Sequence, residues 1–350
     1  MQQVRGEAIQ LARESRGMTQ NKLALETSIP QANISQFERG EKQITEDALM
    51  KISMVLDYPT TFFERDIVPR GLGVSGIFHR KKLSIPMHTL KKIQAEFSIR
   101  ISEIESLLNN VEIKSANNFH HYKIDEYENV EQIAKIVRAQ WKMPLGPVKS
   151  VIETIENAGG IVFKYDLGTL KIDSQSQWIS DIPPIFFVNK AIPTDRMRFT
   201  LAHEIGHVVM HKYPTLNTED EANKFASAFL MPKDEILEDL IPFSFEKTVP
   251  LKIKWKVSIA AIIMRAFQLG VITFSQKRRY FTRLSALGYR TEEPIELPNE
   301  DPSLVRNLVE TCRVELGYSF NDFCNVLSIS ERDFRTRYLG MPAIRVVRNM

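Results

Sequence analysis

Apolar residues recur at helical spacing through residues 4–64, and this spacing predicts a set of short helices. Tight breaks separate the helices at Arg16-Gly17, at Ser28-Ile29-Pro30 and at Arg39-Gly40, because glycine and proline interrupt regular structure. Pro59 ends the last long helix of the set. The pattern therefore predicts a small helical domain at the N-terminal end.

A connector rich in glycine and basic residues, residues 66–82, follows this domain and indicates a domain boundary. Beyond it the apolar spacing predicts a long helix over about residues 87–108 and another over about 127–141. A polar stretch separates the two helices.

The pattern changes after Pro144, where short runs of β-branched and aromatic residues replace the helical spacing. Two helices follow, over about residues 195–212 and 218–230, and Met231-Pro232 ends the second. The order of helix, small sheet and two helices is typical of an α+β domain. The runs that predict strands are Ile161–Phe163, Gln177–Ile179 and Ile185–Val188.

The composition is that of a globular protein, with 43% of the 350 residues hydrophobic and 25% charged. No apolar run reaches the ~18 residues that span a bilayer, and the polar start shows no signal-peptide core. Cys312 and Cys324 form no disulfide framework, so we expect reduced thiols in a cytoplasmic protein. The net charge of +3 is spread thinly, so any case for nucleic-acid binding needs a local motif.

The segment His203-Glu204-Ile205-Gly206-His207 carries the clearest candidate chemistry. Two histidines four residues apart lie on one face of a helix, where a single metal ion can bind both. Glu204 lies between them, where it can take a proton from water at the metal. Gly206 leaves room for a neighbouring strand or a substrate. The alternative, a surface helix with two histidines, fits the apolar surroundings of the motif less well.

The next helix offers a third ligand. Its inward face is an apolar stripe, and Glu219 extends the middle of that stripe, whereas Glu221 lies at its edge. We therefore prefer Glu219 to Glu221 as the ligand, with Asn223 one turn later as a hydrogen-bonding partner of the ligands. Three ligands leave a fourth position for water, which marks a catalytic site.

Two runs in this order resemble a known family. Arg198–His211 resembles the active-site helix of the ImmA/IrrE metallopeptidases, and Glu219–Pro232 resembles the second helix of that family. The first glutamate of the E-x-x-A-N-x-F-A pattern would be the ligand there, which agrees with Glu219. The resemblance covers roughly residues 130–290. It implies a zincin-like fold and a helix-turn-helix repressor as the substrate.

His211 lies on the same face as His207, one turn further along the predicted helix. It could be a fourth ligand, a hydrogen-bond donor to the transition state, or a packing residue at the helix end. We favour the last, because a polar or cationic group is favourable near a helix C-terminus. His211 and Asn223 are thus expected around the ligands and not among them.

Residues 4–64 are similar to the Xre/Cro-type helix-turn-helix of phage and bacterial repressors. Thr19 would cap the first helix of the motif, and the first residues of the second helix would enter the major groove of DNA. Asparagine and glutamine can pair with adenine, and Gln20 with Lys22 would contact phosphates. The expected DNA-contacting residues are Gln20, Gln31, Ala32, Asn33 and Gln36.

An alternative use of this domain is protein contact, because it is close to neutral, and such domains also form homodimers. A weaker similarity to the same motif lies at Gly317–Tyr338, where we favour a plain helical hairpin. The basic residues Arg80-Lys81-Lys82 and Lys91-Lys92 are best interpreted as solvated. Residues 247–290 could hold a substrate or sensor surface.

We therefore expect an α+β, mostly helical chain of four parts. These are a five-helix helix-turn-helix domain (1–64), a linker and helix (65–119), a zincin-like HExxH domain with a small sheet (120–240) and a helical accessory region (241–350).

The expected function is that of a DNA-binding regulator with zinc-dependent endopeptidase activity. One Zn²⁺ per chain, or another divalent metal, would be bound by His203, His207 and Glu219. The alternative is a helix-turn-helix regulator whose zinc domain is a sensor or interaction module without significant proteolysis.

Overall fold

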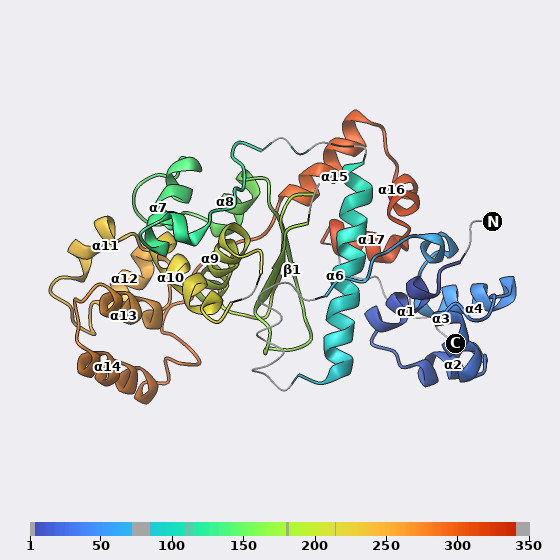
Figure 1. Ribbon diagram of the computed structural model, residues 1–350, viewed down its shortest axis with the longest axis horizontal. Helices are drawn as coiled ribbons and strands as arrows, with labels where there is room; N and C mark the ends of the chain where they lie inside the picture. Colours follow the sequence, from blue (N-terminus) through green and yellow to red (C-terminus); the bar gives the residue numbers. More distant parts are fainter. Residues whose placement is uncertain are drawn as a thin grey trace. The chain divides into compact units, whose positions relative to one another are not determined.

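The computed structural model describes residues 4–71, 85–109, 111, 113, 115–179, 182–213 and 215–340 (Figure 1). The chain forms two compact units that alternate along the sequence. The terminal unit contains Met1–Leu72, Leu83–Ile113 and Leu304–Met350, and the central unit contains Gly73–Lys82 and Lys114–Ser303. Residues 241–350, which we expected as one accessory region, are thus shared between both units. Residues 80–82 of the basic connector lie outside the described residues.

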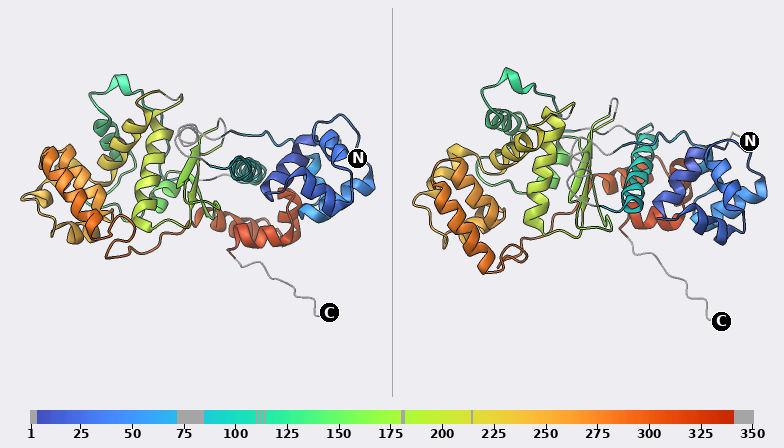
Figure 2. Two further views of the ribbon diagram at one scale, coloured as in Figure 1. Left: turned by 90° about the horizontal axis from the view of Figure 1, so that it is seen from below. Right: turned by 60° about the horizontal axis from the view of Figure 1, so that its bottom comes forward.

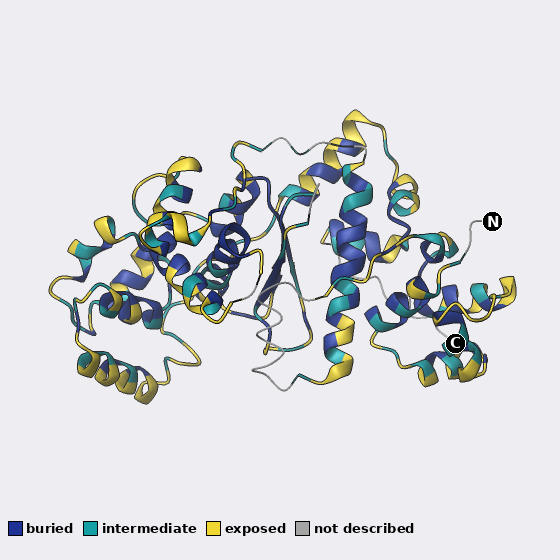
Figure 3. Cartoon of the chain, viewed as in Figure 1, coloured by how far each residue is buried: buried dark blue, intermediate teal, exposed yellow. Residues whose placement is uncertain are grey.

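All regular secondary structure in the described residues of the terminal unit is helical. Thr19 begins α2 by accepting a hydrogen bond from the backbone N–H of Lys22 at 3.1 Å, as the sequence predicts. The middle of the long helix α6 is buried (Figure 3), because α1 and α16 both pack against it. The elements are α1 (Gly6–Ser15), α2 (Gln20–Thr27), α3 (Gln31–Glu38), α4 (Glu46–Leu56), the 3-10 helix η1 (Thr60–Glu64), α6 (Met87–Leu108), α15 (Leu304–Glu315), α16 (Phe320–Leu327) and α17 (Glu331–Tyr338).

The central unit places helices around one small sheet (Figure 2). The strand order is β1-β3-β2, with β1 parallel and β2 antiparallel to β3. The strands are β1 (Ile161–Tyr165), β2 (Ser174–Gln177) and β3 (Ile185–Asn189). The helices are η2 (Ile124–Glu126), α7 (Val130–Gln140), α8 (Val151–Asn157), α9 (Thr194–Met210), α10 (Thr218–Leu230), α11 (Lys233–Leu240), α12 (Thr248–Trp255), α13 (Ile259–Gln268) and α14 (Phe274–Ala286).

The prediction of an α+β, mostly helical chain with a small sheet is confirmed. Two strands lie where the apolar runs predict them, but the second strand precedes its predicted position and contains Ser174–Gln177. The sequence is misleading there because Trp178, an aromatic residue that favours strands, lies just beyond the end of β2 and is 42% exposed. No helix in the described part of the chain is long and apolar enough to cross a membrane.

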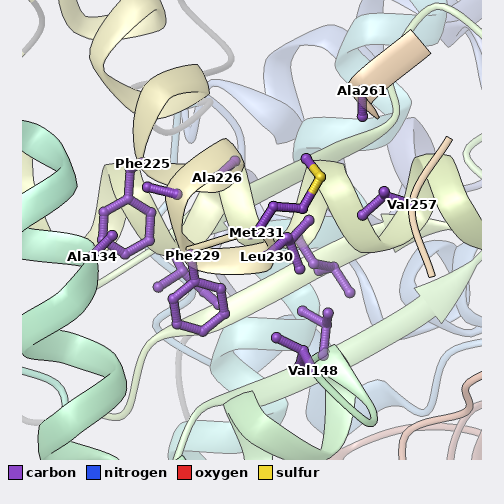
Figure 4. Packing of buried hydrophobic residues seen from close by; sticks show 14 of the residues in the cluster. Ala134, Val148, Phe225, Ala226, Phe229, Leu230, Met231, Val257 and Ala261 are labelled. Atoms are coloured by element: carbon purple, nitrogen blue, oxygen red, sulfur yellow. The ribbon is translucent and has the colours of Figure 1, made fainter. Parts of the chain in front are cut away.

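The core of the central unit forms around α10. The rings of Phe225 and Phe229 stack, with centroids 5.6 Å apart, and both side chains are fully buried. Figure 4 shows these rings beside Ala134 of α7 and, further along the cluster, Val148 and Met231. The apolar stripe of α10 therefore faces inward, as its period predicts.

Arg198 on α9 is fully buried and joins three distant segments of the central unit. Its guanidinium donates to the carbonyl oxygens of Val148 at 2.6 Å and of Lys256 at 2.8 Å, and it forms an ion pair with Glu300. The Glu300 carboxylate also accepts from the backbone N–H of Val151 at 2.7 Å, at the start of α8. These bonds fix the N-terminal half of α9 in place.

We predict that Arg198→Met lowers the free energy of unfolding of the central unit by about 3–5 kcal/mol, because it leaves a buried carboxylate without its cation. Arg196→Met is the matched control on the same helix, since Arg196 is 55% exposed and pairs with Asp173 at the surface. Its effect should stay below about 1 kcal/mol. Urea denaturation of both variants measures the difference, and similar destabilisation by both would contradict the role given to Arg198.

Candidate metal centre and nucleic-acid interface

Helices α9 and α10 pack closely at Gly206. A Cβ atom at this position would lie 3.1 Å from Cδ1 and 3.2 Å from Cβ of Phe225. Helix α10 is therefore the element that packs closely at Gly206, where a strand or a substrate was one expectation. This close packing brings the start of α10, with its acidic first turn, beside the HExxH motif of α9.

Three predicted ligand side chains converge between the two helices. The Nε2 atoms of His203 and His207 lie 2.8 Å apart. Oε1 of Glu219 lies 3.3 Å from Nε2 of His207, and Oε2 lies 3.8 Å from Nε2 of His203. Two imidazole nitrogens and one carboxylate oxygen form a donor set that fits zinc or a similar divalent ion.

The other nitrogen of each imidazole is held by a further side chain. Nδ1 of His203 lies 3.1 Å from Oδ1 of Asn223, and Nδ1 of His207 lies 3.1 Å from Nδ1 of His211. Nε2 of His211 in turn lies 3.0 Å from Oε2 of Glu221. These contacts leave the Nε2 lone pairs of both ligands facing Glu219, the orientation that a metal ion requires.

Burial keeps His203 and His211 neutral near pH 7. It lowers the pKa of His203 to about 4, and the neighbouring His207 adds to the shift. Burial lowers the pKa of His211 to about 3, again with a contribution from His207. A neutral imidazole binds metal without first losing a proton, so protons compete weakly for this site near pH 7.

Glu204, the expected general base, is 1% exposed and faces strand β2. The hydroxyl of Ser174 donates to Oε1 of Glu204 at 2.8 Å, and the hydroxyl of Ser176 donates to Oε2 at 2.6 Å. Residues two apart on a strand point to the same face, which explains why both serines reach one carboxylate. The two bonds fix the carboxylate, and each oxygen keeps lone-pair capacity for a further donor.

Sequence reasoning missed two residues of this cluster, Ser174 and Ser176, and did not predict where Glu221 lies. The signal for the serines is the alternation in Ser174–Gln177, where residues two apart face α9. Glu221, considered as an alternative ligand, instead contacts His211. His211 ends α9, as expected of a helix-end residue, and it also joins His207 to Glu221.

The metal cluster is reached by solvent from one side. The side chain of Glu219 is 35% exposed and that of His203 is 13% exposed, whereas His207 is 3% exposed. A substrate carbonyl can therefore approach from the side of Glu219 and His203. This arrangement can bind a metal ion, bring a carbonyl to it and supply a buried carboxylate beside it.

The expected DNA-contacting residues lie on α2 and α3 of the terminal unit. Gln31 and Ala32 are exposed, and Gln20, Asn33 and Gln36 are partly buried. Ser28 has φ of 57°, a left-handed conformation that forms the sharp turn between the two helices.

A chain of hydrogen bonds positions Gln31 at the start of α3. Buried Arg13 pairs with Glu38 at 2.6 Å, Glu38 accepts from Nε2 of Gln20 at 2.8 Å, and Gln20 accepts from Nε2 of Gln31 at 2.8 Å. Sequence reasoning did not identify Lys42, which lies in the loop after α3. Its Nζ atom donates to Oδ1 of Asn33 at 3.0 Å.

Comparison with known proteins gives one family match in each of the regions that contain the two candidate sites. Residues 155–267 match the family model of the IrrE N-terminal-like domain, which is a peptidase family, and residues 9–63 match the helix-turn-helix model. No curated protein matches the chain. The two matches give the chain the ImmA/IrrE architecture, in which a DNA-binding type of domain precedes a domain of metallopeptidase fold.

We predict that Glu219→Gln and Glu221→Gln differ in metal content. Glu219→Gln should lose the bound metal on dialysis, because an amide is a far weaker ligand than a carboxylate. Glu221→Gln should keep one metal ion per chain, with an affinity weaker by about tenfold to a hundredfold, because it only supports His211. Elemental analysis and chelator competition measure both. Retention by Glu219→Gln together with loss by Glu221→Gln would reverse the assignment.

Proposed function

We propose that the chain is a cytoplasmic, DNA-binding regulator with zinc-dependent endopeptidase activity. The observation that carries the proposal is the placement of Glu204 beside the His203, His207 and Glu219 cluster, with its carboxylate held by two serine hydroxyls. A purely structural metal site needs no buried carboxylate of this kind next to its ligands.

The proposed reaction is hydrolysis of a peptide bond. Zinc bound at the cluster would polarise the carbonyl and lower the pKa of water to about 7. Glu204 takes one proton from the attacking water, the water oxygen bonds to the carbonyl carbon, and the C–N bond breaks. Glu204 then gives the proton to the leaving amine, so that it ends the reaction as a carboxylate.

Ser174 and Ser176 orient the base during these steps. Their hydroxyls donate to the two carboxylate oxygens of Glu204, which prevents the carboxylate from rotating away. Asn223 and His211 hold the rings of His203 and His207 in the same way. The chain thereby fixes both ligands and base before a substrate binds.

The proposed substrate is a helix-turn-helix repressor, and its cleavage would relieve repression. Support comes from the architecture, in which a helix-turn-helix domain and a peptidase-family domain occur in one chain. The N-terminal helix-turn-helix would bring the enzyme to DNA, where such a repressor is found. The proposal also includes a homodimer, and it allows a divalent metal other than zinc.

We predict that Glu204→Gln lowers peptide cleavage by about a hundredfold to ten-thousandfold, because it removes the base. Wild type and variant would be loaded with zinc and incubated with helix-turn-helix repressors from the same locus. The wild type and the variant should bind equal amounts of metal, because Glu204 lies outside the ligand set. Glu238→Gln, an exposed change on α11, is the control and should cleave as wild type does.

Equal cleavage by wild type and Glu204→Gln would contradict the mechanism. Cleavage by neither, with metal bound to both, would favour the alternative of a regulator whose zinc domain is a sensor.

We predict that Gln31→Ala combined with Asn33→Ala weakens operator binding by about 1–3 kcal/mol for each amide–base pairing that the change removes. Gln43→Ala, an exposed change in the loop after α3, is the control. Binding would be measured at several salt concentrations, because phosphate contacts depend on salt and base contacts depend on sequence. Unchanged operator binding by the double variant would show that the recognition helix is wrongly assigned.

A further inference from the structure

The three C-terminal helices repeat the first three helices of the chain. α16 and α17 begin and end 300 residues after α2 and α3, with no insertion between them. α15 occupies the place of α1 in the same alignment. The segment Gly317–Tyr338, for which a plain helical hairpin was favoured, therefore has the connection lengths of a helix-turn-helix.

The backbone conformations match at the positions where conformation is most restricted. Gly17 and Gly317 have φ of 64° and 70°, and Ser28 and Ser328 have φ of 57° and 52°. Positive φ is uncommon for a residue other than glycine, so its occurrence at both serines is a specific correspondence. The turn between the two helices of the motif is the same in both copies.

The side chains match as well. Thr19 and Ser319 cap the first helix of the motif by accepting from the backbone N–H three residues later. Six pairs of buried apolar residues occupy the same positions, so the two copies share most of the central contacts of their cores. The matching pairs are Ala8 and Leu308, Ile9 and Val309, Ala12 and Cys312, Leu23 and Phe323, Ile29 and Ile329, and Ile34 and Phe334.

Helix α6 packs against both copies, and the C-terminal copy differs in the charged groups that it contacts there. Its core is completed by α6, where the fully buried carboxylate of Glu103 accepts from Tyr338 and Arg337, each at 2.6 Å. At the position of Tyr338, the N-terminal copy has Glu38, which pairs with Arg13 inside its own domain. The C-terminal copy is thus built to pack against other parts of the chain.

The first turn of α17 contacts the N-terminal domain. Asp333 is 7% exposed and forms ion pairs with Arg16 at 2.7 Å and Arg337 at 2.8 Å. Asp57, at the end of α4, pairs with Arg332 at 2.6 Å and accepts from the hydroxyl of Ser330 at 3.2 Å. In a DNA-binding helix-turn-helix, this turn of the second helix faces the base edges.

The charges in this turn oppose contact with DNA. Glu331 and Asp333 occupy the positions of Gln31 and Asn33, so carboxylates replace the amides of the N-terminal copy. A carboxylate repels the phosphates on either side of a DNA groove, whereas it attracts the arginines of a protein surface. Here Asp333 forms an ion pair with Arg16, and this pair would break if the first turn of α17 approached DNA.

We propose that residues 304–340 are a second helix-turn-helix whose recognition helix binds the N-terminal domain of the same chain instead of DNA. The surface that it occupies includes Arg16, Asp57 and Tyr58, whose hydroxyl accepts from Arg337 at 3.3 Å. Gln31 and Ala32 of α3 stay exposed, so this docking leaves the expected DNA-contacting surface of the first copy accessible.

Hydrogen exchange in the full chain tests the docking. Asp333→Asn should speed exchange of backbone amides near Arg16 and Asp57 by about tenfold, because it removes the charge that holds Arg16. Glu331→Gln is the matched control on the same turn, since Glu331 pairs with Arg335 within α17. Arg16→Met should produce the reciprocal effect, with faster exchange in α17. No change with Asp333→Asn, or an equal change with Glu331→Gln, would overturn the docking.

Hydrogen exchange in the presence of a mixed-sequence DNA duplex at low salt tests the claim that the recognition helix of the second copy does not bind DNA. The amides of α17 should exchange at the same rate with and without DNA, and Arg335→Ala with Thr336→Ala should leave DNA affinity unchanged. Protection of α17 by the duplex, with weaker binding by the double variant, would show that the second copy reads DNA and would overturn the proposal. Neither experiment depends on peptidase activity.

Discussion

The close packing of α9 against α10 at Gly206 is the constraint on which the metal centre depends. A Cβ at this position would lie 3.1 Å from the Phe225 side chain, so the ring or α10 would have to shift by a few tenths of an ångström. Glu219 lies at the start of α10, so a shift of this helix would change its distance from the two histidines of α9. A glycine that carries no functional group therefore contributes to the arrangement in which three candidate ligands from two helices lie together.

Buried charged side chains hold several helices and one carboxylate in place in the two units. In the central unit, Arg198 fixes α9 through Glu300, and two serines of β2 fix the carboxylate of Glu204. In the terminal unit, ion pairs of Arg16 and Glu103 join the C-terminal helices to the N-terminal domain and to α6. An uncompensated buried charge is costly, and each pair therefore holds its segments in one arrangement.

The sequence predicts the parts of the protein that follow from local periodicity. The length of α6 and the extents of α9 and α10 agree with the structure because helical spacing predicts them. The side chains of His203, His207 and Glu219 lie close enough to hold one metal ion, but this depends also on the packing of α10 against α9. The partners of Glu204 could not be predicted, because Ser174 and Ser176 come from a polar strand far away in sequence. The docking of residues 304–340 on the N-terminal domain is missed for the same reason, since it depends on contacts about 300 residues apart.

X-ray absorption spectroscopy of the zinc-loaded full chain tests the central claim most directly, because it counts the ligands of the metal. The account predicts a four-coordinate ion with two imidazole nitrogens and two oxygens at about 2.0–2.2 Å, one oxygen from Glu219 and one from solvent. Four protein ligands without a solvent oxygen, for example with a third imidazole from His211 in its place, would describe a closed structural site. That result would contradict the assignment of a catalytic centre.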